Sequence, residues 1–481
     1  MELKKIIKNI KGAEIYGDTS VDINNVTADS TLVTPGSLFI CINGKVNDGH
    51  TFIKNAEKYG AVAFITEVKL DTSLPQIVVQ NSRQAMALIA SEYYNHPERK
   101  MKMLAVIGTN GKTTTSHLIH KILSTCGIKS GIIGTLGTFY DEKVIEPTLT
   151  TPDPLDLYKI LADMYKSGVK VVVMEVSAHA IFYDKVKFID YEVAVFTNFS
   201  RDHLDFFTDI DCYKDSKLKF FRQNKCKYVV TNVDDEVGRE ITTIRKDAIT
   251  YGIDNPSDIF AVNIKEDAEG SKFVLNLFDC IYDINFDLIG RFNVYNALAS
   301  ATASALVGAE TDGVCLGLNE MERVSGRLEN VFSGGFNVFV DYAHTPDGLK
   351  KALLALRPIC KSRLICVFGC GGNRDVGKRY EMGSISGDLA DFTVITSDNP
   401  RYEDPMDIIQ RIEKGMLSVS KNYVIVQDRA MAIEYALNYA CEGDVVLIAG
   451  KGSEKYQEIL GIKKLYNDKD TVMECLGRKK C

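Results

Sequence analysis

The sequence predicts an α/β protein with two sheets of mainly parallel strands, preceded by a smaller α/β region. Short apolar runs recur, and each is followed by a Gly-rich or polar stretch and then by a helical pattern. The runs are almost continuous and rich in β-branched residues, which is typical of strands buried on both faces of a parallel sheet. Because ligands bind beyond the C-terminal ends of such strands, the polar clusters at these ends are the candidate functional residues.

The size and composition of the chain limit the possible functions. With 481 residues, of which 45% are hydrophobic and 25% charged, the chain is too long for one ordinary core. Its net charge of −7 argues against non-specific binding to nucleic acid or to a membrane surface. No signal peptide or apolar run of about 18 residues occurs, so we expect no membrane insertion and a cytoplasmic location. The 12 cysteines are scattered without a C-x-x-C pair, and we expect them to be reduced.

The predicted elements fall into three domains along the chain. Residues 1–99 contain the shorter apolar stretches SLFICI, AVAFIT and QIVV and no phosphate loop, which indicates a smaller α/β domain. Residues 100–328 begin after the polar, Pro-containing segment NHPERKMKM and contain the strands MLAVI, VVVM and VAVF. Residues 329–481 begin within VSGRLENV and contain the strands LICVF, FTVIT and VVLI.

The strongest candidate site is the segment GTNGKTTT, which follows the predicted strand MLAVI. Gly108 and Gly111 allow tight turns and a close approach of the backbone to phosphate groups. The next residues, KTTTSHLIHKIL, have helical spacing, so a helix N-terminus would direct amide donors at the phosphates. Lys112 would reach the β- and γ-phosphates and Thr113 would bind Mg²⁺. The loop is shorter than the common G-x-x-x-x-G-K form, and a simple glycine turn is the alternative.

Two further strand ends carry groups suited to metal binding. Glu175 ends the strand VVVME, where a phosphate loop requires a carboxylate on a neighbouring strand, although a satisfied strand-end carboxylate is the alternative. His203 lies in TNFSRDHLD, between Asp202 and Asp205. A histidine in D-H-x-D beyond a buried strand is a candidate metal ligand or catalytic group, and a structural turn histidine is the alternative.

Lys217 is predicted to lie on the buried face of a helix. In CYKDSKLKFF, Tyr213, Phe220 and Phe221 share its face, whereas the neighbouring lysines can point outward. One alternative is a snorkelling lysine whose ammonium reaches water. The other is a lysine whose charged form is disfavoured by burial. A neutral amine can react with CO₂ to form a carbamate, which is a carboxylate on a long arm.

Nine short motifs stand in one order along almost the whole chain: G-T-N-G-K-T-T, E-V-S-x-H, T-N-x-S-R-D-H-L-D, G-R-F-N-V-Y-N, S-G-R-L-E, D-Y-A-H-T-P-D, G-C-G-G-N-R-D-x-G-K-R, D-N-P-R and G-K-G-x-E-x-Y-Q. Together they resemble the Mur ligases, and among them the ligases that add the third peptide residue of peptidoglycan. The short phosphate loop is the form that this family uses. The resemblance implies an N-terminal UDP-sugar-binding domain, a central P-loop ATPase-like domain with a parallel or mixed sheet, and a C-terminal Rossmann-like domain that binds the amino acid.

The resemblance implies ATP-dependent amide bond formation through an acyl phosphate. ATP would phosphorylate the D-glutamate of UDP-N-acetylmuramoyl-L-alanyl-D-glutamate, and the amine of meso-diaminopimelate would then displace the phosphate. Because an anion attacks an anion, cations and oriented amides must neutralise the charge. By resemblance, Lys112 would hold phosphates, and Thr113 and Glu175 would hold a first Mg²⁺. His203 and Lys217, the latter as N6-carboxylysine formed with CO₂, would hold a second. Lys112, His203 and Lys217 are the expected catalytic residues.

The resemblance also assigns residues to three small-molecule substrates. The residues expected to bind ATP are Gly108, Thr109, Asn110, Gly111, Lys112, Thr113, Thr114, Asn293, Asn296, Arg327, Asp341 and His344. The residues expected to bind the UDP-muramoyl-dipeptide are Ser30, Thr150, Thr151, Ser177 and Lys185. The residues expected to bind diaminopimelate are Arg374, Asp398, Asn399, Pro400, Arg401, Gly450 and Glu454. For the segment around His344, a turn with a satisfied histidine is the alternative. No partner beyond these substrates is implied, and we expect a monomer.

Arg401 is the residue from which we predict that the added amino acid is diaminopimelate rather than lysine. The asparagine before the proline of D-N-P-R is held extended, which helps to project the next side chain, and a guanidinium can bind a carboxylate through two hydrogen bonds. Diaminopimelate differs from lysine by one distal carboxylate, and in this family the arginine accompanies diaminopimelate. A surface arginine after a proline turn is the alternative.

The sequence departs from the family pattern at four positions. Thr31 replaces the arginine of D-S-R, Ala178 the second serine of S-S-H, Lys185 an arginine that grips the substrate, and Ser453 a histidine. A lysine keeps the charge of an arginine but loses its planar fork. A lysine-adding or other paralogous ligase therefore remains an alternative. A folylpolyglutamate synthase is disfavoured by D-N-P-R and the full N-terminal domain, and a nucleotide-dependent binding module would not need the catalytic set.

Overall fold

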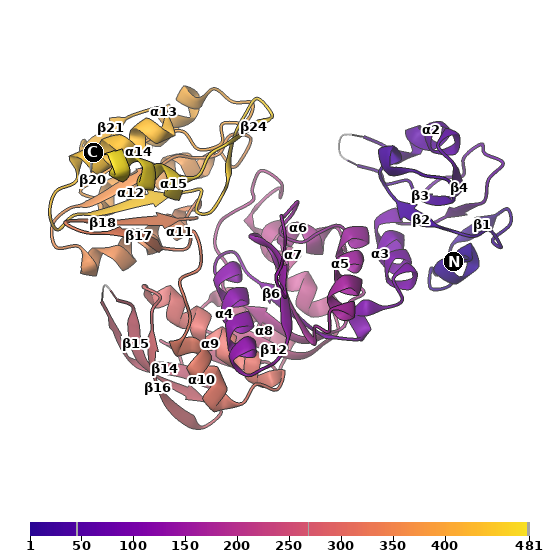
Figure 1. Cartoon of the computed structure of the whole chain (residues 1–481), viewed down its shortest axis with the longest axis horizontal. Helices are drawn as coiled ribbons and strands as arrows, with labels where there is room; N and C mark the ends of the chain where they lie inside the picture. Colours follow the sequence, from indigo (N-terminus) through magenta and orange to yellow (C-terminus); the bar gives the residue numbers. More distant parts are fainter. Residues whose placement is uncertain (45–46, 268, 479–481) are drawn as a thin grey trace. The chain divides into compact units, whose positions relative to one another are not determined.

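The structure is a computed structural model that describes residues 1–44, 47–267 and 269–478 (Figure 1). It contains two compact units, each built from several stretches of chain. The first consists of Met1–Val106, Ile128–Ala194 and Ser216–Tyr228, and the second of Ile107–Gly127, Val195–Asp215 and Val229–Cys481. Four elements contain residues of both units: β6 Lys102–Ile107, β11 Tyr191–Phe196, α7 Ile210–Gln223 and β12 Cys226–Asn232. The three-domain boundaries near residues 99 and 328 stay a prediction.

The start of the first unit is a five-stranded sheet between helices. Its elements are α1 Leu3–Ile6, β1 Glu14–Tyr16, β2 Asn25–Thr27, η1 Ser30–Leu32, β3 Ser37–Ile40, η2 Gly49–Phe52, α2 Ile53–Lys58, β4 Ala61–Thr66, β5 Gln76–Val78 and α3 Ser82–Tyr93. The strand order is β1-β5-β4-β3-β2, and all neighbours are parallel except β1 and β5. Leu38 and Ile40 face α1 and α3, whereas Phe39 faces α2, because alternate residues of a strand point to opposite faces.

The remainder of the first unit carries a second set of strands. Its elements are η3 Pro97–Arg99, β7 Ser130–Gly134, β8 Gly137–Tyr140, β9 Lys143–Ile145, α5 Pro154–Lys166, β10 Val171–Glu175 and α6 Ala178–Phe182. β10 pairs in parallel with β6 and with β7, while β8 and β9 add antiparallel strands. Glu175 stands opposite Val106, so it ends the buried strand as the sequence predicts.

The first part of the second unit carries the phosphate-loop helix. Its elements are α4 Lys112–Thr125, α8 Glu236–Ile244, β13 Ile249–Gly252, β14 Ile259–Glu266, β15 Ser271–Leu277, β16 Cys280–Phe286, α9 Arg291–Leu306 and α10 Thr311–Asn319. α4 packs against α9 and α10. β12, β13 and β14 are parallel, and β15 and β16 extend the edge in antiparallel fashion.

The end of the second unit is a sheet covered by helices on both faces. Its elements are β17 Glu329–Ser333, β18 Asn337–Asp341, α11 Pro346–Leu356, η4 Arg357–Ile359, β19 Leu364–Phe368, α12 Gly377–Leu389, β20 Phe392–Ile395, α13 Pro405–Leu417, β21 Tyr423–Ile425, α14 Arg429–Tyr439, β22 Val445–Ala449, β23 Tyr456–Ile459, β24 Ile462–Leu465 and α15 Asp468–Arg478. The sheet order is β17-β18-β22-β19-β20-β21, with only β17 antiparallel. α11, α12 and α13 pack on one face, and α14 and α15 on the other.

The predicted α/β class is confirmed, and so are the strands that define it. Each apolar run named above forms a strand, and the segment after the phosphate loop forms α4. The antiparallel strands β7–β9 and β14–β16 were not predicted. β14 alternates buried and exposed residues at its start, which is the pattern of a strand with one open face rather than of a buried parallel strand.

Candidate active site

The loop between β6 and α4 is shaped by its two glycines. Gly111 has a φ of 84°, in the left-handed region that favours glycine. A Cβ added at Gly111 would lie 2.4 Å from Oδ1 of Asn296, and one added at Gly108 would lie 1.9 Å from the hydroxyl oxygen of Thr197. The short loop is therefore held tightly against two neighbouring segments, and a larger residue at either position does not fit.

Gly111→Ala is expected to weaken ATP binding about tenfold, because alanine in this backbone conformation costs roughly 1–2 kcal/mol and its Cβ overlaps Asn296. The Kd for ATP can be measured by calorimetric titration. The matched control is Gly127→Ala, since Gly127 has a φ of 70° but no atom within 4 Å of an added Cβ. Equal ATP affinity in the two variants would contradict the tight fit of the loop.

The first residues of α4 lie next to an arginine of a distant segment. The Lys112 ammonium donates to two loop carbonyls, at 3.0 and 2.9 Å, so it lies over the loop. Thr113 is buried, and its Oγ1 accepts from Nη2 of Arg327 at 2.9 Å. The Arg327 guanidinium also lies 4.6 Å from the centre of the Tyr342 ring. Three residues predicted to bind phosphate, metal and nucleotide are thus close together.

Two asparagines of α9 lie beside α4. Asn296 donates through Nδ2 to Oδ1 of Asn293 at 3.0 Å, and its own Oδ1 accepts from the Thr115 hydroxyl at 3.3 Å. Asn293 donates to the carbonyl of Ile289 at 2.8 Å. Both asparagines are buried, and Asn296 connects α9 to the phosphate-loop helix. Their contact with adenine stays a prediction.

Asp341 and His344 follow β18 and lie near Arg327. Asp341 accepts from the backbone N–H groups of Leu328 and Ala343, at 2.6 and 2.8 Å, which fixes the chain next to Arg327. Removal from water raises the pKa of Asp341, although the charge of Arg327 acts against it. Removal from water also lowers the pKa of His344, whose Nδ1 lies 2.8 Å from a backbone carbonyl. Their contact with ATP stays a prediction.

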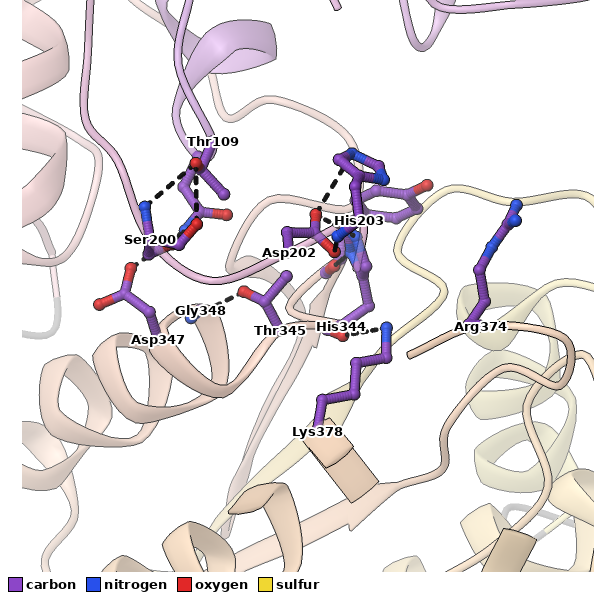
Figure 2. A network of polar contacts seen from close by, with 12 residues as sticks. Thr109, Ser200, Asp202, His203, His344, Thr345, Asp347, Gly348, Arg374 and Lys378 are labelled. Carbon is purple, nitrogen blue, oxygen red and sulfur yellow. Dashed lines mark hydrogen bonds and ion pairs between the residues drawn. The ribbon is translucent and has the colours of Figure 1, made fainter. Parts of the chain in front are cut away.

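A polar network surrounds Asp202, next to the predicted metal ligand His203 (Figure 2). The backbone N–H of His203 donates to Asp202 at 2.8 Å, and its ring Nε2 lies 3.4 Å from the other carboxylate oxygen. His344 Nε2 lies 3.9 Å from that oxygen, and Lys378 donates to the His344 carbonyl at 3.0 Å. Burial would raise the pKa of Asp202, but the charges of these three neighbours outweigh it and lower the pKa. Asp202 therefore lies between two predicted site histidines, His203 and His344.

Thr109 and Asn110 connect the phosphate loop to the segment before Asp202. The Ser200 N–H donates to the Thr109 hydroxyl at 3.1 Å, and the Tyr213 hydroxyl lies 3.1 Å from the same oxygen (Figure 2). The Asn110 amide donates to the Ser200 hydroxyl at 3.2 Å and to Asp347 at 3.0 Å. Both loop residues are thus fixed by contacts with the protein.

The predicted burial of Lys217 is confirmed. Its side chain is 1% exposed. The aromatic residues predicted to share its face are buried as well: Tyr213, Phe220 and Phe221. Lys214 and Lys219 of the same helix remain partly exposed, with side-chain exposures of 35% and 27%. The snorkelling alternative is therefore wrong, because α7 removes Lys217 from water while it leaves its neighbours at the surface.

Glu175 belongs to a buried polar cluster of the first unit. Its Oε1 accepts from the Thr135 N–H at 3.0 Å, and its Oε2 accepts from the Thr135 hydroxyl at 2.9 Å. A Cβ at Gly134 would lie 2.1 Å from Oε1, so a glycine is required there. The carboxylate is fully buried and oriented by the turn after β7.

Three residues expected to hold the muramoyl-dipeptide lie in the same cluster. The Thr151 hydroxyl donates to the backbone carbonyl of Glu175 at 2.8 Å and accepts from the Ser177 N–H at 3.0 Å. The hydroxyl oxygens of Thr150 and Thr135 are 3.2 Å apart. Three hydroxyl groups, of Thr135, Thr150 and Thr151, therefore lie around Glu175.

Lys185 and Thr31 stand where the family pattern has residues that bind the muramoyl-dipeptide, and the structure shows which contacts they make instead. Lys185 pairs with Asp153 at 2.7 Å. Ser30 starts η1, and Thr31 donates its N–H and its hydroxyl to Asp29, at 2.8 and 2.7 Å. Thr31 thus stabilises a local turn and supplies no cation where the family has an arginine. Lys185 supplies a cation, and it is already paired with a carboxylate.

Arg401 lies in a constrained turn beside Arg374. Its φ is 51°, its Nη1 donates to the Gly372 carbonyl at 2.8 Å, and its Nε lies 3.3 Å from the Glu458 carboxylate. A Cβ at Gly371 would lie 3.0 Å from Arg401 Nη1 and 3.6 Å from Arg374 Cγ. Both arginines predicted to bind donor carboxylates therefore border one glycine. A non-glycine residue in this conformation is often part of a functional site.

Arg374 reaches toward the loop that contains His203. Its Nη1 lies 3.2 Å from Asp205, and its side chain is half exposed. Figure 2 shows the Arg374 side chain near His203 and Lys378. Pro400 is packed closely, because a Cβ at Gly372 would lie 1.9 Å from the Pro400 carbonyl oxygen. The packed backbone holds D-N-P-R in place, while Arg374 remains open to solvent.

Asp398, Asn399 and Glu454 form the inner part of the predicted donor site. Asn399 is buried and donates through Nδ2 to Oε2 of Glu454 at 2.9 Å. Gly450 has a φ of 116°, and a Cβ there would lie 2.8 Å from Asp398. Burial would raise the pKa of Asp398, but nearby cations, first among them Lys451, lower it. The predicted residues are thus brought together around two carboxylates.

Sequence reasoning missed four residues that orient the predicted ones: Thr135, Asp202, Lys378 and Lys451. Asp202, Lys378 and Lys451 stand inside the motifs D-H-x-D, G-C-G-G-N-R-D-x-G-K-R and G-K-G-x-E, so their neighbours in sequence could have indicated them. Thr135 carried no sequence signal, because its partner Glu175 lies 40 positions away.

The side chains present suit Mg²⁺ better than a metal held entirely by protein. Within residues 1–44, 47–267 and 269–478, no group of three or more His, Cys, Asp or Glu side chains could hold a metal ion. Mg²⁺ keeps several waters and takes one or two carboxylates together with substrate phosphates. The Thr113 hydroxyl and the buried Glu175 carboxylate are hard oxygen donors of the required kind.

In the described part of the chain, no helix combines the length and apolarity needed to cross a membrane.

A glycine-shaped phosphate loop, oriented carboxylates and two arginines beside one glycine are the features of a nucleotide-dependent enzyme. Three family models match in the expected order: Mur ligase family, catalytic domain, over residues 22–94; Mur ligase middle domain over 106–304; and Mur ligase, glutamate ligase domain, over 326–452. The chain belongs to the Mur ligase family.

Similar proteins cover nearly the whole chain. UDP-N-acetylmuramoyl-L-alanyl-D-glutamate--2,6-diaminopimelate ligase 1 of Clostridium acetobutylicum is 41% identical over 480 residues, which are 98% of each chain. A ligase named for the same substrates in Clostridioides difficile is 40% identical over 99% of this chain and 100% of its own. A solved structure with this name has a TM-score of 0.71 at 28% identity and covers 100% and 99% of the two chains. A folylpolyglutamate synthase of Mycobacterium tuberculosis shares the fold alone, at 20% identity over 76% of this chain.

Proposed function

We propose that this protein is the ATP-dependent ligase that joins meso-diaminopimelate to the D-glutamate of UDP-N-acetylmuramoyl-L-alanyl-D-glutamate. The products are ADP, phosphate and the tripeptide precursor of peptidoglycan. Full-length relatives at about 40% identity carry this activity in their names. The observation that carries the choice of amino acid is Arg401, which lies beside Arg374 in a constrained turn.

In the first half of the reaction, the phosphate loop binds and orients ATP. The N-terminus of α4 is proposed to direct its N–H groups at the phosphates, and Lys112, which lies over the loop, is proposed to add a positive charge. Thr113 and Glu175 are proposed as ligands of Mg²⁺, which neutralises charge on the phosphates when bound. Arg327, which already contacts Thr113, is placed to add a further charge. These charges allow a carboxylate to approach the γ-phosphate.

His203 and Lys217 are proposed as ligands of a second Mg²⁺, with Lys217 as its carbamate. Burial favours an uncharged amine, which is the form that reacts with CO₂. The 1% exposure of Lys217 supports this proposal. Asp202 accepts from the His203 backbone and lies 3.4 Å from its ring Nε2, so it limits the movement of His203.

In the second half of the reaction, the amine of diaminopimelate must be held in one register. Arg401 is proposed to bind its distal carboxylate and Glu454 its distal ammonium. Arg374, half exposed at the edge of the same pocket, is proposed to bind a carboxylate of the donor. The enzyme is proposed to act as a monomer in the cytoplasm.

Phosphate release tests the whole proposal. The purified protein with ATP, Mg²⁺ and the UDP-muramoyl-dipeptide is expected to release phosphate when meso-diaminopimelate is added and to form the tripeptide product, identified by mass spectrometry. Reactions with L-lysine and without an amino acid are the controls. Product with L-lysine alone would overturn the choice of donor, and no product with either amino acid would overturn the acceptor.

A further inference from the structure

Lys451 is a fully buried cation inside the predicted donor site. It follows β22 between Gly450 and Gly452, both with positive φ, and its side chain is 0% exposed. Its ammonium donates to Oδ1 of Asn399 at 3.0 Å and to Oε2 of Glu454 at 2.7 Å. A buried ammonium is stable only when paired, so these two contacts hold it in place.

The position of this ammonium determines which way the Asn399 amide points. Oδ1 of Asn399 accepts from Lys451 and also from the Glu458 N–H at 2.9 Å. A reversed amide would place its NH₂ group against two donors, which is unfavourable. The amide nitrogen is therefore directed at Glu454, where it donates to Oε2 at 2.9 Å.

The same contacts determine which carboxylate oxygen of Glu454 can accept a hydrogen bond from a ligand. Both donors, Lys451 and Asn399, use Oε2, so Oε1 is the oxygen left for an incoming ammonium. The Glu454 side chain is 23% exposed, so it can be reached from solvent. Lys451 thus orients Glu454 and also offsets part of its negative charge.

The charge balance bears on which amino acid the pocket accepts. The carboxylates of Asp398, Glu454 and Glu458 lie near the cations Lys451, Arg401 and Arg429, so the loss of Lys451 would make this group more negative and would favour a simple cation. The distal end of diaminopimelate has an ammonium and a carboxylate, whereas that of L-lysine has only an ammonium. A lysine bound here would leave Arg401 without the carboxylate of a ligand.

We infer that Lys451 is a positioning residue that sets the selectivity for a zwitterionic distal end over a lone ammonium, through its contacts with Asn399 and Glu454. This inference rests on the proposed function. Lys451 itself need not touch the substrate. Its removal would take away one of the two donors to Asn399 Oδ1 and one of the two donors to Glu454 Oε2, and it would make this group of residues more negative.

Lys451→Met is expected to lower kcat/KM for meso-diaminopimelate about 10- to 100-fold, because a buried hydrogen bond to a charged group contributes roughly that factor. The change should lie mainly in the KM for diaminopimelate, with the KM values for ATP and the UDP-muramoyl-dipeptide unchanged. The ratio of kcat/KM for diaminopimelate to that for L-lysine should fall at least about tenfold. If Lys451 had a purely structural role, the substitution would lower kcat/KM for both amino acids by the same factor.

Two further variants separate the outcomes. Lys464→Met, at an exposed position of β24, makes the same substitution outside the pocket and should behave as wild type. Lys451→Gln keeps a hydrogen-bond donor without the charge, and it provides the measurement if the methionine variant does not fold. If the wild type does not use diaminopimelate, the proposed function fails. If the wild type does and the folded Lys451 variants keep its ratio of the two amino acids, only the inference about Lys451 fails.

Discussion

Arg401→Ala is expected to lower kcat/KM for meso-diaminopimelate by at least about 30-fold, since truncating one partner of a buried charge pair costs ~2 kcal/mol or more. The Arg401 side chain is 20% exposed and fixed by Gly372 and Glu458, so its guanidinium is already oriented before a ligand arrives. The loss should appear in the KM for diaminopimelate and leave the KM for ATP unchanged. Steady-state phosphate release with each substrate varied in turn measures this difference.

Arg401→Lys and Arg411→Ala complete the experiment. The lysine variant keeps the charge but not the planar fork, so it should recover only part of the affinity. Arg411 is an exposed arginine of α13, and its loss should have no effect on the donor. An unchanged KM for diaminopimelate in Arg401→Ala would show that another group binds the distal carboxylate.

The elements that the sequence predicted best are those with a continuous local pattern. MLAVI, VVVM and LICVF form β6, β10 and β19 because strands buried on both faces must be apolar at every position. The buried side of the helix that carries Lys217 could also be predicted from a local pattern, because its aromatic neighbours lie three and four positions away and these spacings share one face of a helix. Local spacing was sufficient in each case.

The orienting residues could not be predicted because their partners lie far along the chain. Lys451 meets Asn399 across 52 positions, and Arg327 meets Thr113 across 214. A buried lysine beside a glycine has the same local sequence as an exposed turn lysine. Only the fold shows that Lys451 has no access to water while Lys455 is exposed.

The shortness of the phosphate loop has a physical reason that the sequence alone could not supply. Gly111 is pressed against Asn296, whose amide in turn bonds Asn293 and Thr115. The loop therefore lies directly against α9, with no space for additional loop residues on that side. The motif G-R-F-N-V-Y-N and the phosphate loop therefore pack directly against each other, through Asn296 and Gly111.

Lys217→Ala is expected to reduce ligase activity by about 10³-fold or more, the scale seen when a charge-stabilising group is removed from an active site. The reason is the proposed carbamate, which would supply a carboxylate from a position that is only 1% exposed. A short carboxylic acid such as formate or acetate can occupy the space that alanine opens and replace that carboxylate. Activity should then return in part and rise with the concentration of the added acid.

Lys214→Ala is the matched control, because Lys214 lies on the same helix with its side chain 35% exposed and pairs with Glu240 at 3.5 Å. It should keep wild-type activity and show no response to formate. The carbamate can also be observed directly, as a ¹³C resonance that appears in wild type equilibrated with ¹³CO₂ and is absent from Lys217→Ala. Full activity of Lys217→Ala would sink the carbamate. An inactive but folded variant that no carboxylic acid rescues, together with no ¹³C signal in wild type, would show instead that Lys217 acts as an amine.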